Sequence, residues 1–415
     1  MKTILINTGT ELLLGDVQDA HLAFIAKEIF PLGLRIEEQR TVPDGRGIRS
    51  ALTDLFPRAE IVFVTGGLGP TTDDVTREIT AELLRLKLVS DERVMTAILQ
   101  RFAKRGIKFT ERVSRQAYVP EGAEVFLNEN GTAPGLYLRA NINPPFHSPH
   151  LFLLPGPPRE LQPMFRESVI PKLRSMASTS PLFDRRMYRI AKMGESLVEQ
   201  AIGEKVLAIP GIELGYCARP GEVDVRIIGD PAAVERADTI IRSLLGPAIF
   251  SSNDETLEEV VVKLLVERKE TLALAESCTG GLLADRITDV PGASAVFVAG
   301  YIVYANESKM DVLQVDSALM ERHGAVSETV ARAMAEGARM RAKTTYALST
   351  TGIAGPSGGS PEKPVGTVFI ALAAAGSKTT ARQLFFPSDR ETFKQLTAQA
   401  ALDLLRKTLI KGSGD

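Results

Sequence analysis

Short apolar runs that end in turns of small residues and continue into helical patterns recur along this 415-residue chain. The run Ile61–Thr65 is almost entirely apolar, as expected of a strand that is buried on both faces of its sheet. It ends in the turn Gly66–Gly69, and a helical pattern begins at Thr76. Thr3–Asn7 and Leu272–Ala275 lead into similar turns. Strands that alternate with helices predict an α/β fold with mostly parallel sheets covered on both faces.

Composition narrows the class of protein. A hydrophobic fraction of 44% and a charged fraction of 24% are typical of a soluble globular protein. The net charge of −2 gives no basic field that would attract nucleic acid or a membrane surface. The two cysteines, Cys217 and Cys278, are far apart in sequence and suit a reducing compartment. The chain starts without a signal-peptide pattern and has no apolar run of about 18 residues, so we expect a cytoplasmic protein.

Three domains are predicted. Residues 1–174 form a doubly wound α/β domain, and the small-residue stretch Ser175–Pro181 is a linker. Residues 182–250 form a small α+β domain that resembles RNA-binding KH modules in its order of elements. It lacks the Gly-x-x-Gly loop with which such modules clamp nucleic acid, so a spacer or dimerisation domain is the other interpretation. Residues 253–415 form a second α/β domain.

The turn Ala275–Gly281 carries the strongest chemical signal in the third domain. Ser277 is a poor nucleophile unless a neighbour takes its proton, and no histidine occurs in the strand-end motifs of this domain. Lys309 stands at the end of a strand and the start of a helix. A lysine can act as a base only if burial or cationic neighbours lower its pKa, and Tyr304 would then serve as a relay. The backbone N–H groups of Cys278–Gly281 are candidate donors to an oxyanion.

Each of these residues also has a simpler interpretation. Ser277 and Thr279 could cap the following helix, Cys278 could be a small buried side chain, and Lys309 could be a solvated helix-start residue. The glycines of Thr351–Gly359 could be ordinary turn residues.

A further alternative is that Gly352 and its neighbours form a nest of backbone amides that binds phosphate, with Arg390 adding positive charge. The residues by themselves leave these alternatives open.

Six segments of the last third resemble, in order, the nicotinamide mononucleotide (NMN) deamidase domain of the CinA family, which is named after competence/damage-inducible protein CinA. They are Ala275–Gly281, Tyr304–Lys309, Gly324–Glu328, Thr351–Pro356, Lys363–Val368 and Phe386–Arg390. The family hydrolyses the carboxamide of NMN to nicotinate mononucleotide and ammonia, without a cofactor. The resemblance implies three catalytic residues, which are Ser277, Lys309 and Tyr304. The substrate-binding residues that it implies are Thr279, Gly280, Gly281, Gly352, Ala354, Gly355 and Arg390.

In the first domain, the glycine turn Gly66–Gly69 precedes an acidic pair, Asp73 and Asp74, and a helix. Glycines allow phosphates to approach the backbone closely, and carboxylates beside phosphates suit a divalent cation. The turn matches neither a Walker A loop nor Gly-x-Gly-x-x-Gly. The simpler interpretation is that one of the aspartates caps the helix.

Residues 1–170 resemble the molybdopterin-binding-like domain found at the N-terminus of CinA proteins and in molybdenum-cofactor biosynthesis proteins. The matching segments are Gly9–Gly15, Thr65–Thr76, Asn130–Gly135 and Leu154–Pro158. The resemblance implies a metal-dependent ADP-ribose pyrophosphatase that gives AMP and ribose 5-phosphate. Its phosphate- and nucleotide-binding residues would be Gly9, Glu11, Gly66, Gly67, Gly69, Thr72 and Gly156. Asp73 and Asp74 would hold Mg, Mn or Co, with potassium as a further candidate ion.

One position departs from the family pattern. Relatives usually carry Asp-Thr-Asn where this chain has Asp19-Ala20-His21, so the family's substrate contacts near His21 are not carried over.

Together these features predict a bifunctional pyridine-nucleotide recycling enzyme with NMN and ADP-ribose as substrates, and the resemblance suggests a homodimer. One alternative keeps the deamidase and makes the first domain a nucleotide-binding regulator. The other is a non-enzymatic competence or DNA-uptake partner. The intact Ser277, Tyr304 and Lys309 and the lack of a basic patch weigh against that last alternative.

Overall fold

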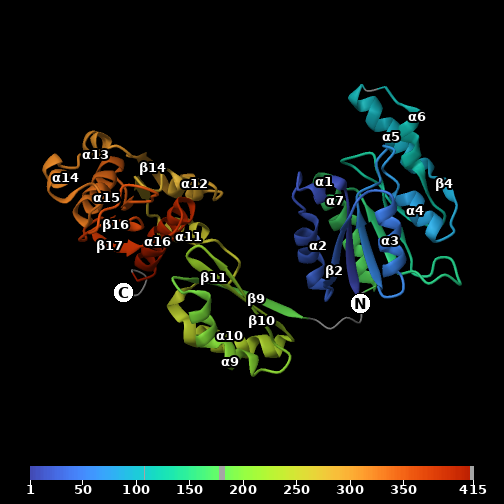
Figure 1. Cartoon of the computed structure of the whole chain (residues 1–415), viewed down its shortest axis with the longest axis horizontal. Helices are drawn as coiled ribbons and strands as arrows, with labels where there is room; N and C mark the ends of the chain where they lie inside the picture. The colour runs from blue at the N-terminus through green and yellow to red at the C-terminus, as the bar shows by residue number, and fades with distance from the viewer. Residues whose placement is uncertain (107, 177–182, 412–415) are drawn as a thin grey trace. The chain divides into compact units, whose positions relative to one another are not determined.

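The computed structural model of the chain describes residues 1–106, 108–176 and 183–411 (Figure 1). Contacts group the chain into two units, Met1–Phe183 and Asp184–Asp415, and the second unit contains two separate sheets. The α/β class predicted from the sequence is confirmed. The predicted linker lies mostly outside the described residues, and its first residue, Ser175, belongs to helix α8 (Ile170–Met176). Within the described ranges, no helix is both long and apolar enough to cross a membrane.

The first unit is built on a six-stranded sheet of order β2-β1-β3-β8-β7-β6. Strands β2, β1, β3 and β8 are parallel, and β7 and β6 continue the sheet in antiparallel pairing. The strands of this sheet are β1 (Thr3–Thr8), β2 (Ile36–Val42), β3 (Ile61–Thr65), β6 (Glu124–Phe126), β7 (Gly135–Leu138) and β8 (His150–Leu154). A separate pair consists of β4 (Leu88–Ser90) and β5 (Tyr118–Pro120). The helices before α8 are α1 (Thr10–Leu14), α2 (His21–Ile29), α3 (Arg46–Leu55), α4 (Thr76–Leu83), α5 (Glu92–Arg105), α6 (Glu111–Ser114) and α7 (Pro158–Met164).

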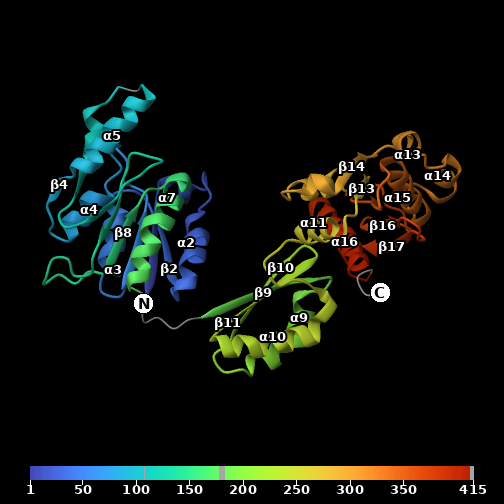
Figure 2. The same ribbon diagram turned by 180° about the vertical axis from the view of Figure 1, so that it is seen from behind.

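Helices cover both faces of this sheet (Figures 1 and 2). Leu5 and Phe63 pack in one core with residues of α2 and α7. Ile4 and Val62, their neighbours along the strands, pack in another core with residues of α3 and α4. Because alternate side chains point to opposite faces, both sets must be apolar, and this accounts for the continuous apolar run of β3.

A four-stranded antiparallel sheet of order β10-β11-β9-β12 starts the second unit and carries helices α9 and α10. Its elements are β9 (Asp184–Ala191), α9 (Glu195–Leu207), β10 (Glu213–Arg219), β11 (Glu222–Gly229), α10 (Pro231–Leu245) and β12 (Ile249–Ser251). These elements confirm the α+β class that was predicted for this part of the chain.

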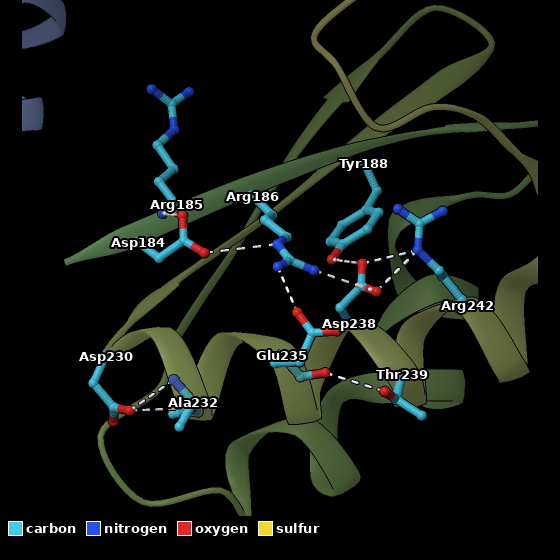
Figure 3. Close-up of polar contacts among 11 residues, drawn as sticks. Asp184, Arg185, Arg186, Tyr188, Asp230, Ala232, Glu235, Asp238, Thr239 and Arg242 are labelled. Carbon is cyan, nitrogen blue, oxygen red and sulfur yellow. Dashed lines mark hydrogen bonds and ion pairs between the residues drawn. The ribbon is translucent and has the colours of Figure 1, made fainter.

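A buried carboxylate, Asp238 of α10, ties this helix to the sheet (Figure 3). It accepts a hydrogen bond of 2.6 Å from the Tyr188 hydroxyl and one of 2.9 Å from Arg242 Nε. Arg186 of β9 forms an ion pair of 3.3 Å with the same carboxylate. These partners compensate the carboxylate for its lost hydration, so Asp238 has a structural role in holding α10 against the sheet.

The last sheet has the order β14-β13-β15-β16-β17, with β14, β13 and β15 parallel. Its strands are β13 (Leu272–Glu276), β14 (Phe297–Ile302), β15 (Tyr346–Gly352), β16 (Thr367–Ala374) and β17 (Thr380–Phe385). The helices are α11 (Leu257–Arg268), α12 (Leu282–Thr288), α13 (Asn306–Leu313), α14 (Ser317–His323), α15 (Glu328–Ala342) and α16 (Arg390–Lys411). Helices α11, α12 and α16 share one core with the sheet, and α13, α14 and α15 share another.

The direction of the strands determines which loops meet. Strand β16 is antiparallel to β15, and β17 is antiparallel to β16, so β17 runs in the same direction as β15. The segments that follow β13, β14, β15 and β17 therefore leave the sheet at one edge. These segments contain Ser277, Tyr304, Gly355 and Arg390.

Candidate active sites

In the first unit, the loops that follow β1, β3 and β8 converge at the carboxyl ends of the parallel strands, where α/β sheets commonly bind ligands. They line a pocket of about 520 Å³. The predicted residues that line it are Gly9, Glu11, Gly66, Gly67, Gly69, Asp73, Asp74 and Gly156. Thr72 is exposed and does not line the pocket.

The glycine turn after β3 is held by side chains beneath it. Gly67 has a φ of 67°, and a side chain there would collide with Thr76 Oγ1. The carbonyl oxygen of Leu68 accepts hydrogen bonds from Arg77 Nη1 at 2.8 Å and Gln116 Nε2 at 3.3 Å. Both donors are almost fully buried. Arg77 and Gln116 were not predicted as site residues, because no sequence motif indicates a buried side chain that supports a loop through a backbone carbonyl group.

The pocket is strongly acidic. Six carboxylates line it and no lysine or arginine does; the carboxylates are Glu11, Asp19, Asp44, Asp73, Asp74 and Glu160. Burial, and then the nearby charges of Glu11 and Asp73, raise the pKa of the Asp44 carboxyl. A polyanionic ligand would be repelled here unless a cation accompanied it.

One of the two predicted metal ligands, Asp74, is held by hydrogen bonds from its own loop. Asp74 Oδ2 accepts hydrogen bonds from the N–H group of Thr71, at 2.9 Å, and from the Thr71 hydroxyl. Helix α4 has no side-chain cap, so the simpler interpretation of the pair as a helix cap is not supported. In the described ranges, no three His, Cys, Asp or Glu side chains are grouped closely enough to form a complete metal cage. Magnesium-like ions commonly use one or two carboxylates together with substrate phosphates, and Asp73 and Asp74 fit that kind of site.

The segment Asp19–His21, where the chain departs from the family pattern, lines part of this pocket. Asp19 accepts hydrogen bonds from Asn7 Nδ2 at 2.6 Å, from the backbone N–H of His21 at 2.8 Å and from the side chain of Gln39. Burial lowers the pKa of His21, against the opposing charge of Asp19. His21 is therefore expected to be neutral at pH 7.

In the last domain, a pocket of about 210 Å³ brings together residues from five segments of the chain. The predicted residues that line it are Ser277, Tyr304, Lys309, Gly352, Ala354 and Arg390. Thr279, Gly280, Gly281 and Gly355 do not line it. Asn306 and Thr351 line it as well and were not predicted as individual site residues.

The pairing of β13 places Ser277 at the centre of the sheet edge. The N–H group of Ser277 donates to Thr350 O at 3.0 Å, and the N–H of Val303 donates to Glu276 O at 2.8 Å. The nucleophile candidate therefore lies between the ends of β14 and β15.

Lys309 is almost fully buried, with 1% of its surface exposed. Its Nζ donates a hydrogen bond of 3.0 Å to the carbonyl oxygen of Tyr304. Burial lowers the pKa of this ammonium, against smaller opposing effects of Cys278 and Glu307. No hydrogen bond joins Ser277 Oγ to Lys309 Nζ among the described residues, although such contacts often tighten only when substrate binds.

Tyr304 contributes through two different atoms. Its backbone oxygen orients Lys309, while its hydroxyl accepts a hydrogen bond of 2.7 Å from Arg390 Nη2. Arg390 Nη1 donates to Gly355 O at 2.9 Å. The hydroxyl thus contacts the guanidinium rather than the lysine, which differs from the predicted relay.

A residue that the sequence analysis did not assign, Glu276, shapes the turn after β13. Its fully buried carboxylate accepts hydrogen bonds from the N–H groups of Gly281, Leu283 and Ala284 at 3.0, 3.1 and 2.9 Å. The N–H of Gly280 donates to Ser277 O at 3.2 Å. The N–H groups of Gly280 and Gly281 are therefore engaged.

Two further side chains of the turn are poor candidates for the nucleophile. Burial raises the pKa of the Cys278 thiol to about 12, so it remains protonated at neutral pH. Thr279 is fully buried, and its hydroxyl hydrogen-bonds to that of Thr350 at 2.8 Å. The backbone N–H groups of these two residues remain the candidate oxyanion donors.

Comparisons with known proteins identify the families that the two ends of the chain resemble. Residues 4–175 match the family described as probable molybdopterin binding domain, and residues 254–409 match the family described as CinA C-terminal domain. Among solved structures, the competence/damage inducible protein CihA from Agrobacterium tumefaciens is 34% identical. The similarity covers 39% of this chain and 99% of that chain, with a TM-score of 0.36.

Similarity to whole proteins extends across both units. A protein of Caldicellulosiruptor bescii described as competence-damage inducible is 40% identical over 99% of this chain and 100% of its own length. A CinA-like protein of Akkermansia muciniphila is 43% identical over 97% of this chain and 96% of its own length. Since this identity runs through both site-bearing domains, the chain belongs to the CinA family.

Proposed function

We propose that the C-terminal domain is an amidase that hydrolyses the carboxamide of NMN, with Ser277 as the nucleophile and Lys309 as the base. The observation that carries the proposal is the buried Lys309, which lines the same small pocket as the Ser277 hydroxyl. A buried lysine without a carboxylate partner favours its neutral form, and only that form can accept a proton.

The reaction follows from these groups. Neutral Lys309 takes the proton of Ser277 Oγ as that oxygen attacks the carboxamide carbon. The N–H groups of Cys278 and Thr279 stabilise the oxyanion, a contribution of about 3 kcal/mol for each good donor. Lys309 returns the proton to the leaving nitrogen, and the C–N bond breaks to release ammonia. Water then hydrolyses the acyl ester and frees nicotinate mononucleotide together with the Ser277 hydroxyl.

Ammonia release from NMN by the purified full-length protein tests this proposal. The wild type should release ammonia, and Ser277→Ala should abolish the release. Cys278→Ala is the matched control, because it changes the adjacent side chain and should retain most activity. Release that survives Ser277→Ala and disappears in Cys278→Ala would point to a thiol nucleophile instead.

For the N-terminal domain, we propose a metal-dependent ADP-ribose pyrophosphatase. The supporting observation is a pocket with glycine turns suited to phosphates and with six lining carboxylates but no lining lysine or arginine. Asp73 and Asp74 would hold the divalent ion, which would neutralise the charge of the pyrophosphate when bound. The glycine turn, supported from below by Arg77 and Gln116, would position the phosphates.

AMP formation from ADP-ribose, measured with Mg, Mn or Co and then with a chelator, tests this second proposal. Asp74→Ala should abolish AMP formation, and Glu121→Ala, which changes an exposed carboxylate outside the pocket, should not. Binding of ADP-ribose without AMP formation would favour a nucleotide-binding regulator.

Salt-sensitive retention of DNA by the purified protein would favour a competence or DNA-uptake partner. Light scattering of the same protein tests the homodimer.

A further inference from the structure

A second hollow lies beside the proposed amidase pocket. It has a volume of about 380 Å³ and is lined by Leu282 together with Arg390, Glu391, Lys394 and Gln395 of α16. Arg390 also lines the amidase pocket, so the two spaces share a wall. The amidase pocket alone, at about 210 Å³, is smaller than the roughly 300–1,000 Å³ of typical small-molecule sites. A ligand larger than a nicotinamide ring would therefore extend beyond the amidase pocket, and the second hollow adjoins that pocket at Arg390.

The ammonium of Lys394 stands over the turn that carries Ser277. A Cβ atom placed on Gly280 would lie 3.9 Å from Lys394 Nζ. In the described part of the chain, Lys394 takes part in no ion pair and no side-chain hydrogen bond. Lys394 is thus a half-buried cation close to Gly280, three residues after Ser277, with its three donors available.

The other cation of the hollow is already oriented. Two nitrogens of Arg390 donate to Gly355 O and to the Tyr304 hydroxyl. Arg390 and Lys394 are four residues apart on α16 and so lie on the same face of the helix. Glu391 is the single carboxylate that lines the hollow, so the two lining cations leave it with a net positive charge.

We infer that Lys394 is a specificity-determining residue that binds the 5′-phosphate of the nucleotide, while the nicotinamide ring occupies the pocket of Ser277. This inference rests on the proposed amidase function and extends it. Lys394 would make the enzyme select the phosphorylated nucleotide over its nucleoside, because the nucleoside offers no anion to this hollow.

The test compares NMN with nicotinamide riboside, which lacks the phosphate, in the full-length protein. Lys394→Gln should lower kcat/KM for NMN by about 10–100-fold, the effect expected from loss of one charge-assisted hydrogen bond. The value for the riboside should change by less than about twofold. Lys394→Arg should retain most of the preference for NMN. Lys378→Gln is the matched control, because Lys378 is exposed at the turn after β16 on the opposite edge of the sheet.

An equal loss for both substrates, or no loss for NMN, would overturn the inference. If the amidase proposal itself is wrong, the wild type will release no ammonia from either substrate, and this outcome differs from both of those above. In that case, calorimetry of NMN binding still tests Lys394. Weaker binding to Lys394→Gln than to Lys378→Gln supports the phosphate site, and equal binding overturns it.

Discussion

Lys309→Met should inactivate the amidase and at the same time stabilise the fold. The ammonium has three N–H donors, and the structure gives it one acceptor, Tyr304 O at 3.0 Å. Among the described residues, no carboxylate lies within 4.0 Å of Lys309 Nζ. Burial of this amine costs free energy whether it keeps its proton without a charged partner or gives the proton up. Methionine is unbranched, fills a similar volume and incurs neither cost.

We expect Lys309→Met to raise the free energy of unfolding at pH 7 by about 1–3 kcal/mol, by analogy with apolar replacement of buried charges. Ammonia release should fall by about 10²–10⁴-fold, the usual contribution of general-base catalysis. Urea denaturation and the NMN assay measure the two effects. The control, Lys378→Met, replaces an exposed lysine and should change neither quantity appreciably.

The stability difference should depend on pH in a defined direction. Burial lowers the pKa of Lys309 in the folded state, whereas the unfolded chain keeps a value of about 10.4. As pH rises from the folded-state pKa towards about 10.4, the unfolded state binds more protons, so the wild type gains stability. The advantage of Lys309→Met should therefore be largest at neutral pH and shrink towards pH 10. A variant that is less stable than the wild type at pH 7, or that stays active, would refute this reasoning.

Three further predictions follow from the same domain. Glu276→Gln should lower the free energy of unfolding by about 2–3 kcal/mol, because an amide cannot accept from all three N–H groups; urea titration measures this, and an unchanged midpoint would contradict it. Iodoacetamide at pH 8 should modify exposed Cys217 and spare Cys278, whose pKa is raised to about 12, with no loss of ammonia release; mass spectrometry identifies the modified thiol. Tyr304→Phe should raise KM for NMN about tenfold and change kcat by less than about threefold, because the tyrosine hydroxyl contacts Arg390 rather than Lys309. A loss of kcat without a change in KM would instead support Tyr304 as a proton relay.

Elements with two buried faces could be predicted closely from the sequence. The run Ile61–Thr65 has the same bounds as β3, since continuous apolar character leaves few alternatives for a short segment. Helix α3 was missed although Ile48, Leu52 and Leu55 recur at helical spacing and are fully buried. Strand β12 is only three residues long, and its assignment depends on pairing with β9, which no local pattern reveals.

The proposed amidase pocket was predictable in part. Ser277, Lys309 and Tyr304 each follow a strand, so parallel pairing was enough to bring them to one edge. The hydrogen-bonding role of Glu276 was not predictable, because it depends on the turn that Gly280 and Gly281 form with positive φ.

The two proposed sites differ in the charge of their side chains, and this predicts two different ways of binding phosphate. The first pocket surrounds its glycine turns with carboxylates, so a pyrophosphate there requires a cation that Asp73 and Asp74 can share with it. The second site places Arg390 and Lys394 beside the nucleophile turn, so a single phosphate there would be neutralised by side chains alone. Within that second site, burial separates two lysines into two roles. Burial lowers the pKa of Lys309 and favours the neutral form that accepts a proton, whereas Lys394 is half-buried, lines the second hollow and is proposed to bind an anion.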